Sequence, residues 1–176
     1  ITSYEIDCVK RLEQEKILVI EATTGSGKST QLPQFFARCE AFCGKPHDFF
    51  SHAQYESTNS PLGSPAQGKL IISTQPVPFV AKSVAERVAL EDDPGNGLGL
   101  RVGLITKTEY YFEPQTCHIL FVSDVQLVEL MTKDPLLSRV SVLIIDEAHE
   151  RTLYTDVIIS LSRDIRRKRP RDFHVV

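Results

Sequence analysis

The chain has 176 residues, of which 41% are hydrophobic and 24% are charged, and its formal net charge is −3 at pH 7. These values are ordinary for one globular domain that can bury its own core. The sequence excludes a membrane-spanning chain, because no apolar run approaches the roughly 18 residues that a bilayer requires. The near-neutral charge leaves a nucleic-acid partner open, since any basic surface must then be local.

The start of the chain and its cysteines favour an intracellular protein, nuclear or cytoplasmic. The first nine residues carry acids and lack the charged-then-apolar pattern of a signal peptide. Because the chain does not begin with Met, we expect it to be a piece of a longer protein. Its four cysteines are scattered, which is typical of free thiols in a reducing compartment.

Short apolar runs alternate with helix-like stretches along the chain. Strands are expected at residues 17–21, 69–74, 118–123 and 140–145, with weaker candidates at 100–105 and 172–176. Helices are expected at 29–39, 79–90, 124–131 and 153–167. The runs are continuously apolar rather than alternating, which is typical of strands buried on both faces. Repeated strand–helix–strand units predict an α/β fold with a mostly parallel sheet flanked by helices.

Residues 40–68 interrupt this alternation. They are rich in Ser, Pro, Gly and Asn without periodicity, so we expect a flexible surface insertion. Cys39, Cys43, His47 and His52 offer four potential zinc ligands near its start. The gap between the Cys pair and the His pair is far shorter than in a zinc finger. A helix end that runs into a polar loop is therefore the favoured interpretation.

A glycine-rich motif, ATTGSGKS at 22–29, lies between the first expected strand and the first expected helix, as a P-loop does. Its glycines let backbone N–H groups point at phosphate oxygens, and the positive end of the helix faces the same anion. Lys28 would place its charge at the β- and γ-phosphates, and the Ser29 hydroxyl would bind Mg²⁺. Ala22 stands where a P-loop usually begins with glycine. The predicted ATP-binding residues are Ala22, Thr23, Thr24, Gly25, Ser26, Gly27, Lys28, Ser29 and Thr30.

An acidic pair directly follows the fourth expected strand. Asp146 and Glu147 stand at the carboxyl end of a buried parallel strand, where such sheets bind ligands. Asp146 would hold Mg²⁺ together with Ser29, and Glu147 would act beside the metal as general base for an attacking water. Alone, such a pair is most often an acid cluster at a helix start; with the P-loop upstream it predicts nucleotide hydrolysis. His149 is either a switch that senses the nucleotide or an ordinary histidine at a helix start.

Two strings resemble the motifs of a known family. TGSGKSTQLPQ at 24–34 resembles the first motif of the DEAH-box RNA helicases, and DEAHERT at 146–152 resembles their second. The resemblance implies that residues 1–176 form an N-terminal RecA-like lobe that hydrolyses ATP with Mg²⁺ to unwind or remodel RNA. It implies single-stranded RNA and a second RecA-like lobe of the same parent chain as partners, besides protein cofactors. His149 would link the ATP site to that second lobe, whose arginine fingers are worth about 10³–10⁵ in rate. We therefore expect the isolated fragment to be nearly inactive.

The motifs that face RNA in that family are recognisable but altered. Val77 and Pro78 replace two arginines that touch the nucleic-acid backbone, and Val125 replaces the glycine of a Thr-Asp-Gly motif. The strand ends before these positions nevertheless carry polar side chains suited to a single strand. Each one alone is equally compatible with strand-end capping, but their joint position favours RNA. The predicted nucleic-acid contacts are Thr74, Gln75, Ser123 and Asp124.

Two charge runs lie outside these motifs. Residues 91–93 are all acidic, and residues 163–171 hold six basic residues against one acid. The basic run is compatible with nucleic-acid binding or a nuclear address. The favoured interpretation is a solvated turn for the acidic run and a solvated helix end for the basic run, where the helix dipole favours cations.

Two other functions stay open beside the motor. One is a helicase-like ATP-binding scaffold with weakened RNA coupling, which the altered RNA-side positions favour. The other is a non-helicase P-loop NTPase such as a kinase or GTPase. It is disfavoured because the chain has no Asn/Thr-Lys-x-Asp element for reading guanine, and because Glu147 beside Asp146 suits attack by water.

Overall fold

A computed structural model of the protein describes residues 2–23, 25–43, 60–64, 68–92 and 94–176. Two of the four proposed zinc ligands, His47 and His52, lie outside the described residues. So does most of the insertion expected at 40–68, and the flexibility of that segment stays a prediction.

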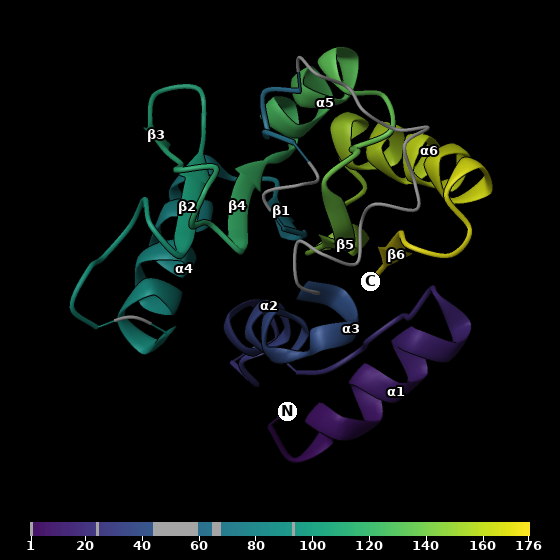
Figure 1. Ribbon diagram of the computed structural model, residues 1–176, viewed down its shortest axis with the longest axis horizontal. Helices are drawn as coiled ribbons and strands as arrows, with labels where there is room; N and C mark the ends of the chain where they lie inside the picture. The colour runs from purple at the N-terminus through teal and green to yellow at the C-terminus, as the bar shows by residue number, and fades with distance from the viewer. Residues whose placement is uncertain (1, 24, 44–59, 65–67, 93) are drawn as a thin grey trace.

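Helices and strands alternate along the chain, as expected (Figure 1). The N-terminal elements are η1 (Thr2–Tyr4), α1 (Glu5–Glu15), α2 (Lys28–Arg38) and α3 (Glu40–Cys43). They are followed by β1 (Leu70–Gln75), α4 (Pro78–Asp92), β2 (Val102–Ile105), β3 (Tyr110–Tyr111) and β4 (Ile119–Ser123). The chain continues through α5 (Asp124–Lys133), β5 (Val140–Ile145), η5 (Ala148–Glu150), α6 (Leu153–Lys168) and β6 (His174–Val175). The four expected helices are confirmed, whereas α1, α3 and β3 were not predicted.

The strands form one six-stranded sheet in the order β3-β2-β4-β1-β5-β6. Every pairing is parallel except that of β3 with β2. Thr74 of β1 is in register with Ile145 of β5, and Gln75 with Ser123 of β4. The carboxyl ends of these three strands therefore lie side by side at one edge. The predicted α/β fold is confirmed, and it is consistent with a RecA-like helicase lobe.

Helices cover both faces of the sheet. Alternate residues of a strand point to opposite faces, and both sets are apolar in the central strands. Ile71, Val142 and Ile144 pack on one face against α1, α2 and α3, with α4 further along the same face. Ile72 and Leu143 pack on the other face against α5 and α6. Figure 1 shows α5 and α6 on one side of the sheet and α1, α2 and α3 on the opposite side.

The strand expected at 17–21 is absent, and this prediction is wrong. Ile17 forms only an isolated parallel bridge with Val175, supported by a 2.9 Å hydrogen bond from Leu18 N to Val175 O. Ile17 is 54% exposed and Val19 is 90% exposed. The segment lies beside β6, which has two residues, so one side of it packs on the core and the other faces solvent. Its continuous apolar pattern had indicated burial on both faces.

The described ends of the segment 40–68 are fixed in the core. Phe42 of α3 and Leu62 are both fully buried. Arg139, also buried, donates to the carbonyl oxygens of Leu62 and Gly68, each at 2.8 Å. Ser60 Oγ donates to a carboxylate oxygen of Asp134 at 2.8 Å. The residues that make these contacts belong to a segment of mostly polar composition, so the sequence did not indicate that they would be buried.

Among the residues that the structure describes, no helix combines the length and the apolar character needed to cross a bilayer.

Candidate functional site

The glycine-rich loop carries the chain from the edge of the sheet into α2. Gly25 and Gly27 have φ angles of 77° and 87°, a backbone region that glycine enters without steric cost. Gly27 is the N-cap residue of α2, so the helix begins at Lys28 with its first N–H groups unbonded within the helix. Apart from its chain neighbours, no described residue has a heavy atom within 4 Å of a Cβ built on Gly25. The loop thus leads into a helix N-terminus, a kind of site that can bind anions.

Two polar side chains of the loop are able to donate hydrogen bonds to a ligand. Lys28 Nζ donates to the carbonyl oxygens of Ala22 at 2.6 Å and of Thr23 at 3.3 Å. The hydroxyl of Ser26 is buried and has no hydrogen-bond partner among the described residues. A buried hydroxyl without a partner is unfavourable. An ammonium and a hydroxyl that both donate are the groups that a phosphate would satisfy.

The remaining residues of the predicted loop continue into α2. Ser29 and Thr30 are half-buried in its first turn. Thr30 Oγ1 donates to Gly27 O at 3.2 Å and closes that turn. Thr24 lies outside the described residues.

The acidic pair lies at the end of β5 in two different environments. Asp146 is 9% exposed, and its Oδ1 accepts a 2.9 Å hydrogen bond from Glu147 N. Its Oδ2 accepts a 2.5 Å hydrogen bond from Gln75 Nε2. Glu147 has a left-handed backbone, with φ at 53°, and a side chain that is 38% exposed. Such a conformation is costly for a residue other than glycine and tends to persist at functional sites.

His149 lies in the short turn η5 that follows the acidic pair. Its side chain is 79% exposed, and Nδ1 lies 3.4 Å from Glu147 Oε2. Arg151, next along the turn, pairs with Asp156 through contacts of 2.7 and 3.1 Å. Thr152 then caps α6 by accepting a hydrogen bond from Thr155 N. His149 is thus on the surface beside Glu147, which is compatible with both interpretations of it.

The loop and the acidic pair meet at the same edge of the sheet. Ile17 runs parallel to β6, and β6 runs parallel to β5. The loop that follows Ile17 therefore emerges at the carboxyl edge, where Asp146 also lies. The helix after the loop packs mainly on the neighbouring strand β1, and its Phe35 and Phe36 belong to a core cluster that also contains Ile144 of β5. Ligands of open parallel sheets bind at this edge.

The four predicted nucleic-acid residues are brought together at the ends of β1 and β4, but their side chains point inward. Thr74, Gln75, Ser123 and Asp124 are at most 2% exposed. Gln75 contacts Asp146, and Asp124 Oδ2 accepts a 2.7 Å hydrogen bond from Thr155 Oγ1 of α6. Their contact with RNA stays a prediction, and in this structure almost none of their surface is accessible.

The altered positions next to them face solvent. Val77, before α4, is 45% exposed, and Val125 in the first turn of α5 is 42% exposed. Phe79 of α4 is 76% exposed. An apolar surface thus stands where the resemblance implies arginines and a glycine.

The basic run is largely a solvated end of α6, as interpreted, but one member of each charge run also makes structural contacts. Glu91 of α4 accepts hydrogen bonds of 2.9 Å from Gln31 and from Gln34 of α2. Hydrogen bonds from Gln34 and then from Arg87 hold the pKa of Glu91 below its ordinary value. Arg169 is 3% exposed and pairs with the Asp172 carboxylate at 2.8 Å. The contacts of Glu91 join two separate helices, so the run of acids by itself did not indicate them.

No protein-family model matches the chain. Curated proteins do match: "Probable ATP-dependent RNA helicase DHX35" of Homo sapiens is 37% identical over 158 residues, 90% of this chain and 19% of that protein. "Pre-mRNA-splicing factor ATP-dependent RNA helicase DEAH10" of Arabidopsis thaliana is 36% identical over 96% of this chain and 20% of its own length. "ATP-dependent RNA helicase HrpA" of Borreliella burgdorferi is 35% identical over 100% of this chain and 18% of its own length. The chain spans about a fifth of these relatives. Over 90% or more of its residues, the chain is thus similar, at 35–37% identity, to one part of several DEAH-box ATP-dependent RNA helicases.

Proposed function

We propose that this chain is the ATP-binding lobe of an RNA-dependent ATPase that uses Mg²⁺. The proposal is carried by the position, at one edge of the sheet, of a loop with a buried hydroxyl that has no partner among the described residues and of a buried carboxylate held by Gln75. The loop fits a phosphate chain, because its groups donate hydrogen bonds. The other half fits Mg²⁺, which prefers oxygen ligands such as those of Ser29, Asp146 and Glu147.

Each residue would have a distinct task. Lys28 would leave the carbonyl oxygens that it contacts and bind the β- and γ-phosphates, with Ser26 and the N–H groups of the loop around it. Ser29 and Asp146 would hold the metal ion, which supplies charge neutralisation at the phosphates when bound. Glu147, more exposed than Asp146, would accept the proton of the attacking water. His149 would carry the state of Glu147 toward a second lobe.

The RNA-dependent part of the proposal rests on the relatives, whose names state ATP-dependent RNA helicase activity. Because the chain covers about a fifth of their length, RNA, the second lobe and protein cofactors are proposed as partners of the whole protein. A second candidate function is an ATP-binding scaffold with weakened RNA coupling. It is favoured by the exposed Val77 and Val125, which offer neither charge nor a glycine's close approach to an RNA strand.

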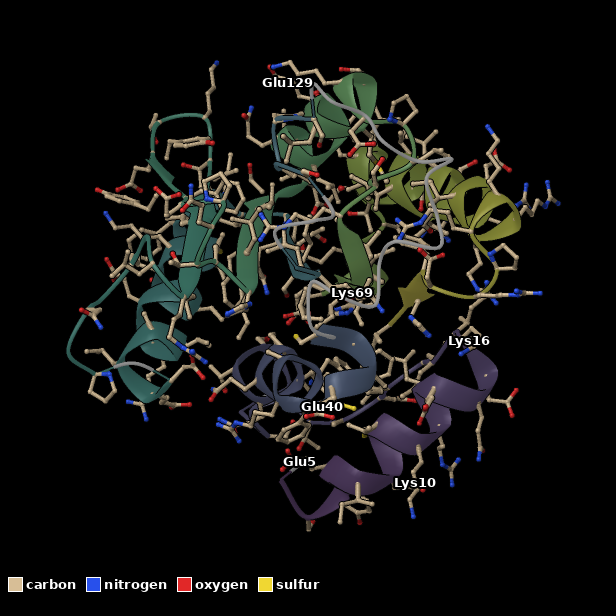
Figure 2. The ribbon with its side chains drawn as sticks, in the orientation of Figure 1. Glu5, Lys10, Lys16, Glu40, Lys69 and Glu129 are labelled. Atoms are coloured by element: carbon tan, nitrogen blue, oxygen red, sulfur yellow. The ribbon has the colours of Figure 1, made fainter. Side chains whose placement is uncertain are left out.

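ATP hydrolysis by the full-length protein, with and without single-stranded RNA, tests both candidates. Lys28→Ala is expected to lower the rate by about 10²–10³-fold, the loss typical of removing one group that stabilises developing charge. Lys10→Ala is the matched control, since this lysine lies on α1, outside the loop, and is exposed (Figure 2).

The outcome separates three cases. A rate that RNA raises and that requires Lys28 supports the helicase lobe. A rate that requires Lys28 but does not respond to RNA supports the scaffold. Hydrolysis that persists in Lys28→Ala would overturn the assignment of the loop.

A further inference from the structure

Gln75, which was expected to contact RNA, has a different partner in the structure. Gln75 ends β1, is 1% exposed, and places Nε2 at 2.5 Å from Asp146 Oδ2. An ionised carboxylate only accepts hydrogen bonds, so the amide must present its nitrogen to it. The other oxygen of Asp146 accepts from Glu147 N. The two oxygens are thus each held by one donor, and the donors come from two different segments of the chain.

We propose that Gln75 is a positioning residue for Mg²⁺ binding at Asp146. The inference rests on the proposed function, because it assigns a role at the same site. The hydrogen bond restrains rotation of the carboxylate, so its remaining lone pairs keep one direction before a metal ion arrives. Partners of this kind orient metal ligands, and their loss typically lowers metal affinity about 10- to 100-fold.

The position of Gln75 in the sheet supports this role over a contact with RNA. β1 lies between β4 and β5, and Gln75 is paired in register with Ser123. Its side chain is enclosed and already bonded, so a strand on the surface would have to displace Asp146 to reach it. The residues after it, Pro76 and Val77, lead into α4. Gln75 therefore joins the carboxylate to the segment that begins α4, rather than presenting its amide to solvent.

The test measures how much Mg²⁺ strengthens ADP binding to the full-length protein, by calorimetric titration of ADP with Mg²⁺ and with a chelator. In Gln75→Leu, we expect the strengthening by Mg²⁺ to fall about 10- to 100-fold. ADP affinity in chelator should stay at the wild-type value, because the phosphate loop is untouched. A role in packing alone would weaken both affinities equally.

Gln34→Leu is the matched control. Gln34 is also 1% exposed, and its Nε2 also donates to a carboxylate, that of Glu91, at 2.9 Å. The same truncation is thus made where no metal ion is proposed, and the strengthening by Mg²⁺ should survive. Gln75→Asn provides a second, polar variant for the case in which Gln75→Leu does not fold. Its amide is one methylene short of Asp146, so it should show the same selective loss.

A double variant tests whether Gln75 acts through Asp146. In an Asp146→Asn background, Gln75→Leu should cause no further loss of the Mg²⁺ effect, because the carboxylate that it positions is gone. A folded Gln75 variant that keeps the full strengthening by Mg²⁺, or loses ADP affinity equally in chelator, would overturn the inference. A wild-type protein that binds no ADP in a Lys28-dependent way would instead overturn the proposed function, and the inference with it.

Discussion

The two halves of the candidate nucleotide site are built in different ways. The loop half consists of consecutive residues, is held by a few local hydrogen bonds, and has Lys28 bonded to its own carbonyl oxygens. The acidic half is assembled by neighbours in space: Asp146 is buried at the end of β5 and bonded to Gln75 of β1. A ligand entering the loop half must therefore rearrange it. The acidic half has its main carboxylate fixed in advance.

This difference assigns different energetic tasks to the two halves. Binding a phosphate costs the loop its internal Lys28 contacts, so the loop half sets affinity through an exchange of partners. An ordered, buried carboxylate needs little reorganisation when charge develops beside it, which is the property that lowers a reaction barrier. We therefore expect variants of the loop to alter binding first, and variants of the acidic half to alter hydrolysis first.

Glu147→Gln should separate hydrolysis from binding with the largest effect. The amide keeps the size of the side chain but cannot accept the proton of the attacking water. We expect ATP hydrolysis by the full-length protein to fall about 10²–10⁴-fold, the typical contribution of a general base. ADP affinity should be nearly unchanged, because the loop half is intact. Steady-state hydrolysis and calorimetric ADP binding are the two measurements.

Glu129→Gln is the matched control for this prediction. Glu129 is an exposed acid on α5 (Figure 2) that pairs with Lys133 rather than with a residue of the candidate site. Its loss should leave hydrolysis at the wild-type rate. If Glu147→Gln hydrolyses ATP as fast as the wild type, another group activates the water, and the division of tasks between the two halves is wrong.

His174 lies on the strand that connects the two halves of the site. It lies on β6, which is hydrogen bonded to β5 on one side and to Lys16 and Leu18 before the loop on the other. Burial lowers the pKa of His174 from 6.5 to about 4. Its Nδ1 lies 3.0 Å from Ser141 O, while Nε2 is buried without a partner among the described residues. The folded protein thus keeps this histidine neutral.

Protonation of His174 should weaken the fold as pH falls. The unfolded chain takes up the proton below about pH 6.5 and the folded chain only near pH 4, so the stabilisation is present above pH 6.5 and is lost between these values. We expect the free energy of unfolding to fall by about 1–3 kcal/mol more than in His174→Gln, whose amide still donates to Ser141. Urea unfolding across this pH range measures it. If the free energy of unfolding depends on pH equally in both proteins, protonation of His174 on β6 is not the cause of the acid sensitivity.

The same contrast explains which features the sequence could predict. The loop half was predictable because its glycines, lysine and serine are adjacent in the chain and act through the local backbone. The bond between Gln75 and Asp146 was not, since it joins residues 71 positions apart and depends on the strand order. The same holds for Asp124 and Thr155. Polar residues at strand ends indicated a surface for RNA, yet these residues are buried, and Gln75 and Asp124 bond to Asp146 and Thr155.

The fold shows a similar limit at the sheet edge. Continuous apolar runs correctly predicted β1, β4 and β5, because each has neighbours on both sides and helices on both faces. The run at 17–21 has the same composition but lies beside the two-residue β6, where Val19 is 90% exposed. The hydrophobic pattern shows which residues of a segment are suited to burial. Whether neighbouring strands cover them depends on the order of the strands in the sheet.

The smallest expected effect concerns the unpartnered hydroxyl of Ser26. Ser26→Ala removes a buried group whose desolvation is uncompensated, so the free energy of unfolding should stay the same or rise by up to about 1 kcal/mol. ADP affinity should fall by about 1–2 kcal/mol, a factor of roughly 5–30, because one donor to the phosphates is lost. Ser73→Ala is the matched control, since its hydroxyl is also buried and has no partner in the described part of the chain, but lies within β1. That variant should match the stability change of Ser26→Ala and leave ADP affinity unaltered.

If both variants bind ADP like the wild type, the Ser26 hydroxyl is unsatisfied for a reason other than the ligand. The loop half would then hold phosphate through its backbone and Lys28 alone.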